Sequence, residues 1–152
     1  MRSRPLLIVL VILVFVGLAM AGSAEKEKSK KRNKNPDAVT VQHVLISFKG
    51  KISKPVERSK KQAEKLAWEI FDRAEVGEDF DALVKEYTND SYPGIYKMTN
   101  RGAARLPGHS LRADMAVYFG DISFRLAPGE IGMAKFHAEL SPFGWHIIKR
   151  LD

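Results

Sequence analysis

The chain has 152 residues, 45% of them hydrophobic, and this composition is typical of one globular domain rather than of a disordered chain. It contains no cysteine, which excludes a disulfide scaffold, a cysteine nucleophile and a thiolate metal site. The formal net charge is +7, but six of the basic residues lie between residues 25 and 35. From Pro36 onward 17 basic residues face 16 acidic ones, so the body lacks the charge for a one-sided basic surface, and we expect no nucleic-acid partner.

Residues 1–24 have the composition of an export signal. Two arginines precede an unbroken apolar run from Leu6 to Val16, and a small residue, Ala21, suits a cleavage site. This pattern predicts a signal peptide and an exported, periplasmic or otherwise extracytoplasmic protein. Residues 6–24 also reach the lower length of a membrane-spanning helix, so an uncleaved anchor that tethers the protein to a membrane is the alternative.

Residues 25–37 contain no large apolar side chain, so they cannot contribute to a hydrophobic core. Their lysine and arginine residues keep the segment solvated, and we expect a basic, flexible linker. The folded body is therefore expected to span residues 38–152 as one domain.

The first half of the body carries clear local signals. A β-branched stretch from Val39 to Phe48 predicts a strand. Ser59 predicts the start of a helix, in which apolar residues recur every three or four positions until Gly77 ends it. A second, shorter helix is predicted from Asp79, and residues 88–94 form a dense cluster of turn-forming residues.

The second half is less regular. Residues 96–110 contain several glycines and little periodicity, so they predict no definite element. Apolar residues between Ala113 and Leu126 predict one or two short helical turns, and residues 131–136 and 145–151 predict strands. The order of strand, helices, strand and strand predicts an α+β fold in which helices pack against a small antiparallel sheet.

Five groups of residues form a pattern in the body, between about Thr40 and Leu151. They are Val-Gln-His43-Val-Leu-Ile, Gly77-Glu-Asp-Phe80-Asp-Ala-Leu83 with Glu86-Tyr-Thr-Asn-Asp90, Met115 with Phe119, Phe124-x-Leu126-x-x-Gly129-Glu130-Ile131, and Ser141-Pro-Phe143-Gly144-Trp145-His146-Ile-Ile-Lys. In this order they resemble motifs of the parvulin-type peptidyl-prolyl cis/trans isomerases. Each motif is weak alone, but five in register are specific.

The resemblance implies a parvulin-like fold for residues 38–152, with a small antiparallel four-stranded sheet packed with three to four helices. It implies a peptidyl-prolyl isomerase that assists the folding of exported or membrane-associated proteins. The substrates would be proline-containing unfolded or extended polypeptides. We expect a monomer that needs no cofactor and no metal.

The resemblance also implies which polar residues form the site. His43 and His146, on two different strands, would form a buried imidazole pair, with Ser141 hydrogen-bonded alongside. Asp90 would approach the prolyl amide and bias its electrostatics through charge and hydrogen bonding. Aspartate in a turn is also common simply because it satisfies backbone donors, and this reading remains open.

Three apolar residues are expected to seat the proline ring. Met115 and Phe119 are spaced i, i+4, so on a helix they would share one face, and Phe143 would form a third wall. An apolar pair at this spacing is also typical of an ordinary core, and partial exposure of the two side chains would decide between these readings.

The sequence departs from the family in one segment. Parvulins usually carry Gly-Gly-Asp-Leu-Gly after the aspartate turn, whereas residues 95–106 of this chain read Ile-Tyr-Lys-Met-Thr-Asn-Arg-Gly-Ala-Ala-Arg-Leu. This change alters one wall of the expected proline pocket. The alternative function is therefore a parvulin-like chaperone or binding domain with weak or no isomerase activity.

Overall fold

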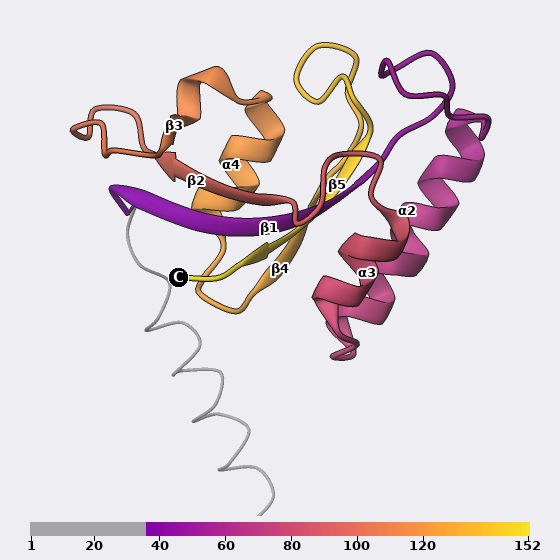
Figure 1. Cartoon of the computed structure of the whole chain (residues 1–152), viewed down its shortest axis with the longest axis horizontal. Coiled ribbons are helices and arrows are strands. Elements are labelled where there is room, and N and C mark those ends of the chain that lie inside the picture. The colour runs from indigo at the N-terminus through magenta and orange to yellow at the C-terminus, as the bar shows by residue number, and fades with distance from the viewer. Residues whose placement is uncertain (1–35) are drawn as a thin grey trace, which may run out of the picture. The chain divides into compact units, whose positions relative to one another are not determined.

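The computed structural model describes residues 36–152, so the predicted signal peptide or anchor at 1–24 and most of the predicted linker at 25–37 lie outside the described residues. In chain order, the elements are β1 (Ala38–Ile46), α2 (Lys60–Glu75), α3 (Phe80–Tyr87), β2 (Ile95–Thr99), β3 (Ser110–Leu111), the 3-10 helix η1 (Arg112–Asp114), α4 (Val117–Arg125), β4 (Ile131–Ala134) and β5 (Trp145–Arg150) (Figure 1).

The strands form one sheet in the order β3-β2-β1-β5-β4. The central strand β1 pairs antiparallel with β2 on one side and with β5 on the other, and β4 pairs antiparallel with β5. The short strand β3 pairs parallel with β2. The centre of the sheet therefore joins the first and the last elements of the described chain, which Figure 1 shows lying side by side.

Helices cover both faces of the sheet, and the side chains of β1 alternate between two cores. Val44 and Ile46 belong to the core under α2 and α3. Val39 and Val41 belong to a second core, which includes the buried side of α4. Because successive side chains of a strand point to opposite faces, His43 shares the α4 face with Val41.

The helix predicted from Ser59 to Gly77 is confirmed as α2, and local signals explain both of its ends. The Ser59 hydroxyl accepts a hydrogen bond from the Gln62 backbone, and the Gln62 side chain accepts one from Ser59, which completes a capping box. Gly77 adopts a φ of 94°, which favours glycine and stops the helix. The apolar side of α2 is buried through Ala63, Ala67, Ile70 and Ala74.

The predicted α+β class is confirmed, but the expected sheet of four antiparallel strands is wrong in two details. The sheet has five strands, and one pair is parallel. Both differences arise between residues 95 and 111. β2 covers five residues and β3 only two, so neither is long enough to produce a clear alternation of polar and apolar residues.

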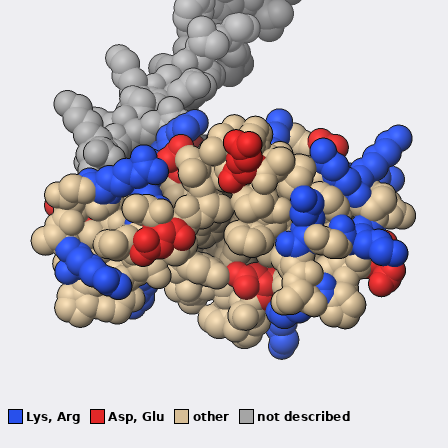
Figure 2. All heavy atoms as spheres, turned by 90° about the horizontal axis from the view of Figure 1, so that it is seen from above, with Lys and Arg blue, Asp and Glu red and all other residues tan. Residues whose placement is uncertain are grey.

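Two further features concern the rest of the surface. No helix among residues 36–152 is long and apolar enough to cross a membrane. On the face drawn in Figure 2, lysine and arginine side chains are interspersed with aspartate and glutamate. This mixed surface agrees with the near-neutral balance of charges in the body.

Candidate functional site

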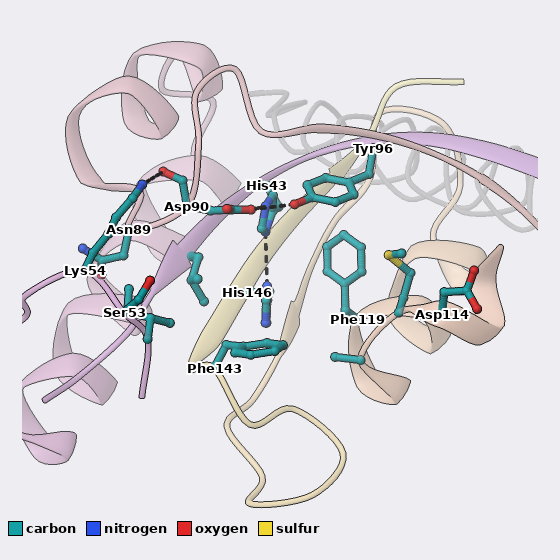
Figure 3. Close-up of a pocket in the computed structure, with 14 residues that line it drawn as sticks. His43, Ser53, Lys54, Asn89, Asp90, Tyr96, Asp114, Phe119, Phe143 and His146 are labelled. Atoms are coloured by element: carbon teal, nitrogen blue, oxygen red, sulfur yellow. Dashed lines mark hydrogen bonds and ion pairs between the residues drawn. The ribbon is translucent and has the colours of Figure 1, made fainter. Parts of the chain in front are cut away.

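A cavity of about 450 Å³ opens on the α4 side of the sheet. It lies between the central strands, the turn after α3, the loop after β1 and the segment that leads into α4, and Figure 3 shows their side chains converging on it. Its lining consists of His43, Leu45, Ile52, Ser53, Lys54, Asn89, Asp90, Tyr96, Asp114, Met115, Ala116, Phe119, Phe143 and His146.

The two histidines predicted to pair do lie together at the base of this cavity. The register of β1 and β5 places His146 opposite Leu45, and His43 is two residues away on the same face of β1. The rings are stacked with an angle of 15° between their planes, and the two Nδ1 atoms are 3.2 Å apart. His43 is only 2% exposed, and His146 is also buried.

The surroundings of His146 define its protonation. Burial lowers the pKa of His146 to about 3, with His43 acting in the same direction and Asp90 against it, so His146 is neutral. His43 Nε2 faces the Asp90 carboxylate at 3.0 Å and therefore donates to it. The two Nδ1 atoms of the rings share a hydrogen bond of 3.2 Å. His146 Nε2 is buried and has no hydrogen-bond partner among residues 36–152.

Asp90 reaches the site because the turn after α3 is hydrogen-bonded to the C-terminal end of β1. The backbone N–H of Leu45 donates to the Thr88 hydroxyl at 3.1 Å, and the Asn89 N–H donates to the Leu45 carbonyl at 2.8 Å. The Asn89 side-chain oxygen accepts a further bond from the Ser47 N–H at 2.9 Å. These bonds hold the turn rigidly against the strand that carries His43.

The Asp90 carboxylate is ionised. Hydrogen bonds from His43, Tyr96 and the Ser91 backbone lower its pKa far below the usual range, and partial burial opposes them only in part. The side chain remains 30% exposed, so its charge is accessible from the cavity. Asp90 thus accepts a bond from a backbone donor of its own turn and also contacts His43 on β1.

Tyr96 is a site residue that the sequence did not reveal. It lies on β2 opposite Val41, and its hydroxyl donates to Asp90 Oδ2 at 2.7 Å. Burial and the bond to Asp90 raise the pKa of Tyr96 to about 12. The alternation of Tyr96 and Met98 with exposed residues is the period-two pattern of a strand, but it is too short to stand out in a glycine-dotted segment.

The three predicted apolar residues all line the cavity, although one premise was wrong. Met115 does not lie on a helix with Phe119, because it follows η1 in an extended conformation and α4 begins only at Val117. Met115 is half-buried and Phe143 is 48% exposed, whereas Phe119 is only 4% exposed and by the criterion of partial exposure belongs to the core under α4, although it also lines the cavity. The Ser47 hydroxyl donates to the Phe143 carbonyl at 2.6 Å, which fixes the segment at the rim of the cavity.

The structure places Ser141 differently from our expectation. Ser141 is fully buried but does not line the cavity. Its hydroxyl donates to the Gly144 carbonyl at 3.2 Å instead of bonding to the histidines, and its backbone pairs with His137. Ser141 thus stabilises the turn before β5, and through that turn the position of His146.

The loop after β1 contributes three further residues to the site. Ile52, Ser53 and Lys54 line the cavity, and Lys54 Nζ donates to the Asp90 carbonyl at 3.1 Å. No group of three or more histidine, aspartate or glutamate residues in the described part of the chain is arranged to hold a metal ion. The site thus combines an apolar wall with polar groups, among them the ionised Asp90 carboxylate and Lys54.

Comparison with known proteins gives a family for this fold and site. The sequence matches the family described as "PPIC-type PPIASE domain" over residues 25–152. It is 31% identical over 120 residues to the chaperone SurA of Pseudomonas fluorescens, and this match covers 76% of this chain and 23% of SurA. The chain therefore spans less than a quarter of the length of that relative.

The fold is shared with solved parvulin structures. Peptidyl-prolyl isomerase ESS1 from Candida albicans has a TM-score of 0.58 and 18% identity, over 89% of this chain and 75% of that one. The solution structure of TbPIN1 has a TM-score of 0.56 and 20% identity, over 76% of this chain and 98% of that one. The family match extends over most of the sequence, and the five motifs lie within it. This chain belongs to the PPIC-type, or parvulin-type, family of peptidyl-prolyl cis/trans isomerases.

Proposed function

We propose that the cavity seats a proline ring and that Asp90 promotes rotation about the preceding peptide bond. The observation that carries this proposal is the composition of the cavity: Met115, Phe119 and Phe143 offer an apolar seat, and the ionised Asp90 shares the same space. A proline ring needs an apolar surface, and the amide beside it responds to charge. Both requirements are met in a single cavity of about 450 Å³.

The chemistry requires no bond to be made or broken. Rotation is opposed by amide resonance, with a barrier of ~18–20 kcal/mol, and resonance places negative charge on the carbonyl oxygen. A fixed negative charge near that oxygen disfavours this charge build-up and weakens the partial double bond. Asp90 would act in this way, and His43 would hold it in place with a hydrogen bond of 3.0 Å.

We propose that the substrates are proline-containing unfolded or extended polypeptides, and that they include exported or membrane-associated proteins. Similarity to a protein named as a chaperone supports the first part. The export-signal composition of residues 1–24 supports the second, with residues 6–24 as a membrane tether if the signal is not cleaved. The enzyme would act as a monomer outside the cytoplasm.

A second candidate function is a chaperone that binds such polypeptides with weak isomerase activity. The observation that favours it is the exposure of Phe143, which is 48% accessible at the cavity rim and offers an apolar contact to an unfolded chain. A protein that only binds such chains needs this surface but not the ionised carboxylate.

A refolding assay separates the two functions. A test protein whose slow phase is limited by proline isomerisation refolds with the wild-type chain, with Asp90→Asn, and with Asp72→Asn, which removes a charge from the exposed side of α2. An isomerase accelerates the slow phase, and Asp90→Asn removes most of that acceleration while Asp72→Asn keeps it. Suppressed aggregation with an unchanged slow phase for the wild-type chain would contradict the proposal and support the chaperone.

A further inference from the structure

Two donors converge on one oxygen of Asp90. Oδ2 accepts a hydrogen bond from His43 Nε2 at 3.0 Å and another from the Tyr96 hydroxyl at 2.7 Å. Figure 3 shows the Asp90 carboxylate and the Tyr96 hydroxyl pointing toward one another beside His43, with Phe119 next to Tyr96. His43 alone therefore does not determine the position of Asp90.

Packing of the Tyr96 ring fixes the position of its hydroxyl. The ring packs edge-on against His43 with centroids 5.1 Å apart, and against Phe119 with centroids 5.4 Å apart. Its strand, β2, is fixed to β1 by a register in which Tyr96 lies opposite Val41. A donor on so rigid a support can fix the group that it binds.

The close approach of the chain at Gly94 makes this geometry possible. The Gly94 carbonyl accepts a hydrogen bond from the His43 N–H at 3.0 Å, and a Cβ at Gly94 would lie 2.6 Å from the His43 carbonyl oxygen. Gly94 also has a φ of 67°. Gly94 therefore allows the chain after Asp90 to approach β1 closely. β2 begins at the next residue, and Tyr96 follows two residues after Gly94.

We infer that Tyr96 is a positioning residue for the isomerisation, whose hydroxyl holds Asp90 Oδ2 in the orientation in which the carboxylate acts on the prolyl amide. This inference rests on the proposed function, because it requires that Asp90 acts on the substrate.

The chemistry of a phenol suits this role. A phenol donates a strong hydrogen bond to a carboxylate and adds no charge, whereas a lysine or arginine would neutralise the charge that acts on the amide. The raised pKa of Tyr96, about 12, keeps the phenol protonated as a donor. The segment of residues 95–106, which departs from the usual family sequence, thus contributes Tyr96 and its polar group to the cavity lining.

The test is a double-mutant cycle on the full chain with an X-Pro peptide as substrate. The variants are Tyr96→Phe, Asp90→Asn and the two combined. The matched control is Tyr118→Phe, because Tyr118 packs against the same core, lies outside the cavity lining, and makes its ring contact with His137. We expect Tyr96→Phe to lower kcat about tenfold with KM within about twofold of wild type, and Tyr118→Phe to change neither.

The cycle distinguishes action through Asp90 from a structural effect. If Tyr96 acts through Asp90, Tyr96→Phe costs nothing further in the Asp90→Asn background. In addition, the Asp90 carboxyl followed by ¹³C NMR should titrate at a higher pH in Tyr96→Phe than in wild type, and not in Tyr118→Phe. If Tyr96→Phe does not fold, Tyr96→Leu replaces it, because leucine also lacks the hydroxyl. The same loss of kcat is expected for Tyr96→Leu.

Three results would overturn the inference. An active wild type with an equally active Tyr96→Phe would remove Tyr96 from the mechanism and leave the proposed function standing. Full additivity of Tyr96→Phe and Asp90→Asn would show that Tyr96 acts elsewhere. An inactive wild type would refute the proposed function, and the inference with it.

Discussion

The two faces of the sheet use the same strands for opposite purposes. On the face under α2 and α3, most buried residues of β1 and β5 are apolar, as Val44, Ile46 and Ile147 illustrate. On the face toward α4, the same two strands place His43 and His146 at the base of a cavity. Figure 1 shows the two sets of helices that cover these faces.

The difference shows how the domain can combine stability with a polar site. Apolar side chains stabilise the fold wherever they are buried, whereas a buried imidazole costs free energy unless its nitrogens are hydrogen-bonded. On the α4 face, His43 is bonded through both nitrogens and His146 through one. The face under α2 and α3 thus contributes more to the free energy of unfolding than the cavity face does. The following variants test this difference.

The largest effect is expected for Phe119, which belongs to both the core under α4 and the cavity. Phe119→Ala should lower the free energy of unfolding by ~3–5 kcal/mol and also remove most turnover of an X-Pro peptide. Met115→Ala, at a half-buried cavity position, should reduce turnover with a clearly smaller loss of stability. Urea unfolding and peptide isomerisation measure the two effects, and equal loss of stability in both variants would assign Met115 to the core.

Ile147 tests the opposite face. Ile147 is fully buried in the core under α2 and α3. Ile147→Ala should lower the free energy of unfolding by ~2–5 kcal/mol, because it leaves a void in a close-packed core. Turnover per folded molecule should stay at the wild-type level at a temperature where the variant is folded. A selective loss of turnover would show that the two faces are not independent.

The histidine pair should show coupling. His43→Ala and His146→Ala should each destabilise the fold by ~1–3 kcal/mol, because each leaves a buried nitrogen of the other ring unsatisfied. The double variant should cost less than the sum of the two single variants. Chemical unfolding of all three measures the coupling, and strict additivity would mean that the two rings do not interact in solution.

The cavity face should also make stability depend on pH. The pKa of His146 falls from 6.5 to about 3 on folding, so between these values the unfolded chain binds a proton that the folded chain does not. Stability must therefore fall as the pH is lowered from 6.5. Below pH 3.8, the lowered pKa of Asp90 acts in the same direction, because the folded carboxylate stays ionised while the unfolded one binds a proton.

Replacement of His146 isolates its share of this dependence. His146→Phe cannot titrate, so its free energy of unfolding should depend on pH less steeply between 3.8 and 6.5, by about one proton. Urea unfolding at several pH values measures the slope. An unchanged slope would show that His146 charges in the folded state and that its burial is less complete than the structure indicates.

Local signals allowed α2 to be predicted almost to the residue, because both its capping serine and its terminal glycine act through neighbours in the chain. The strands at the two ends of the body were predicted from β-branched runs, which are likewise local signals. The strands β2 and β3 were not, since their residues form a strand only by pairing with β1 and with each other. The position of Met115 outside α4 depends likewise on the packing around η1.

The sequence by itself determined the α+β class, the family and the residue types available to the site, because these depend on local periodicity and on motifs read along the chain. Only the tertiary structure decided which side chains meet. It brought His43 to His146 through the register of β1 and β5, moved Ser141 out of the histidine network, and added Tyr96 to Asp90. The physical reason is that a hydrogen bond between distant segments depends on distances of a few tenths of an ångström, which packing sets and sequence spacing does not.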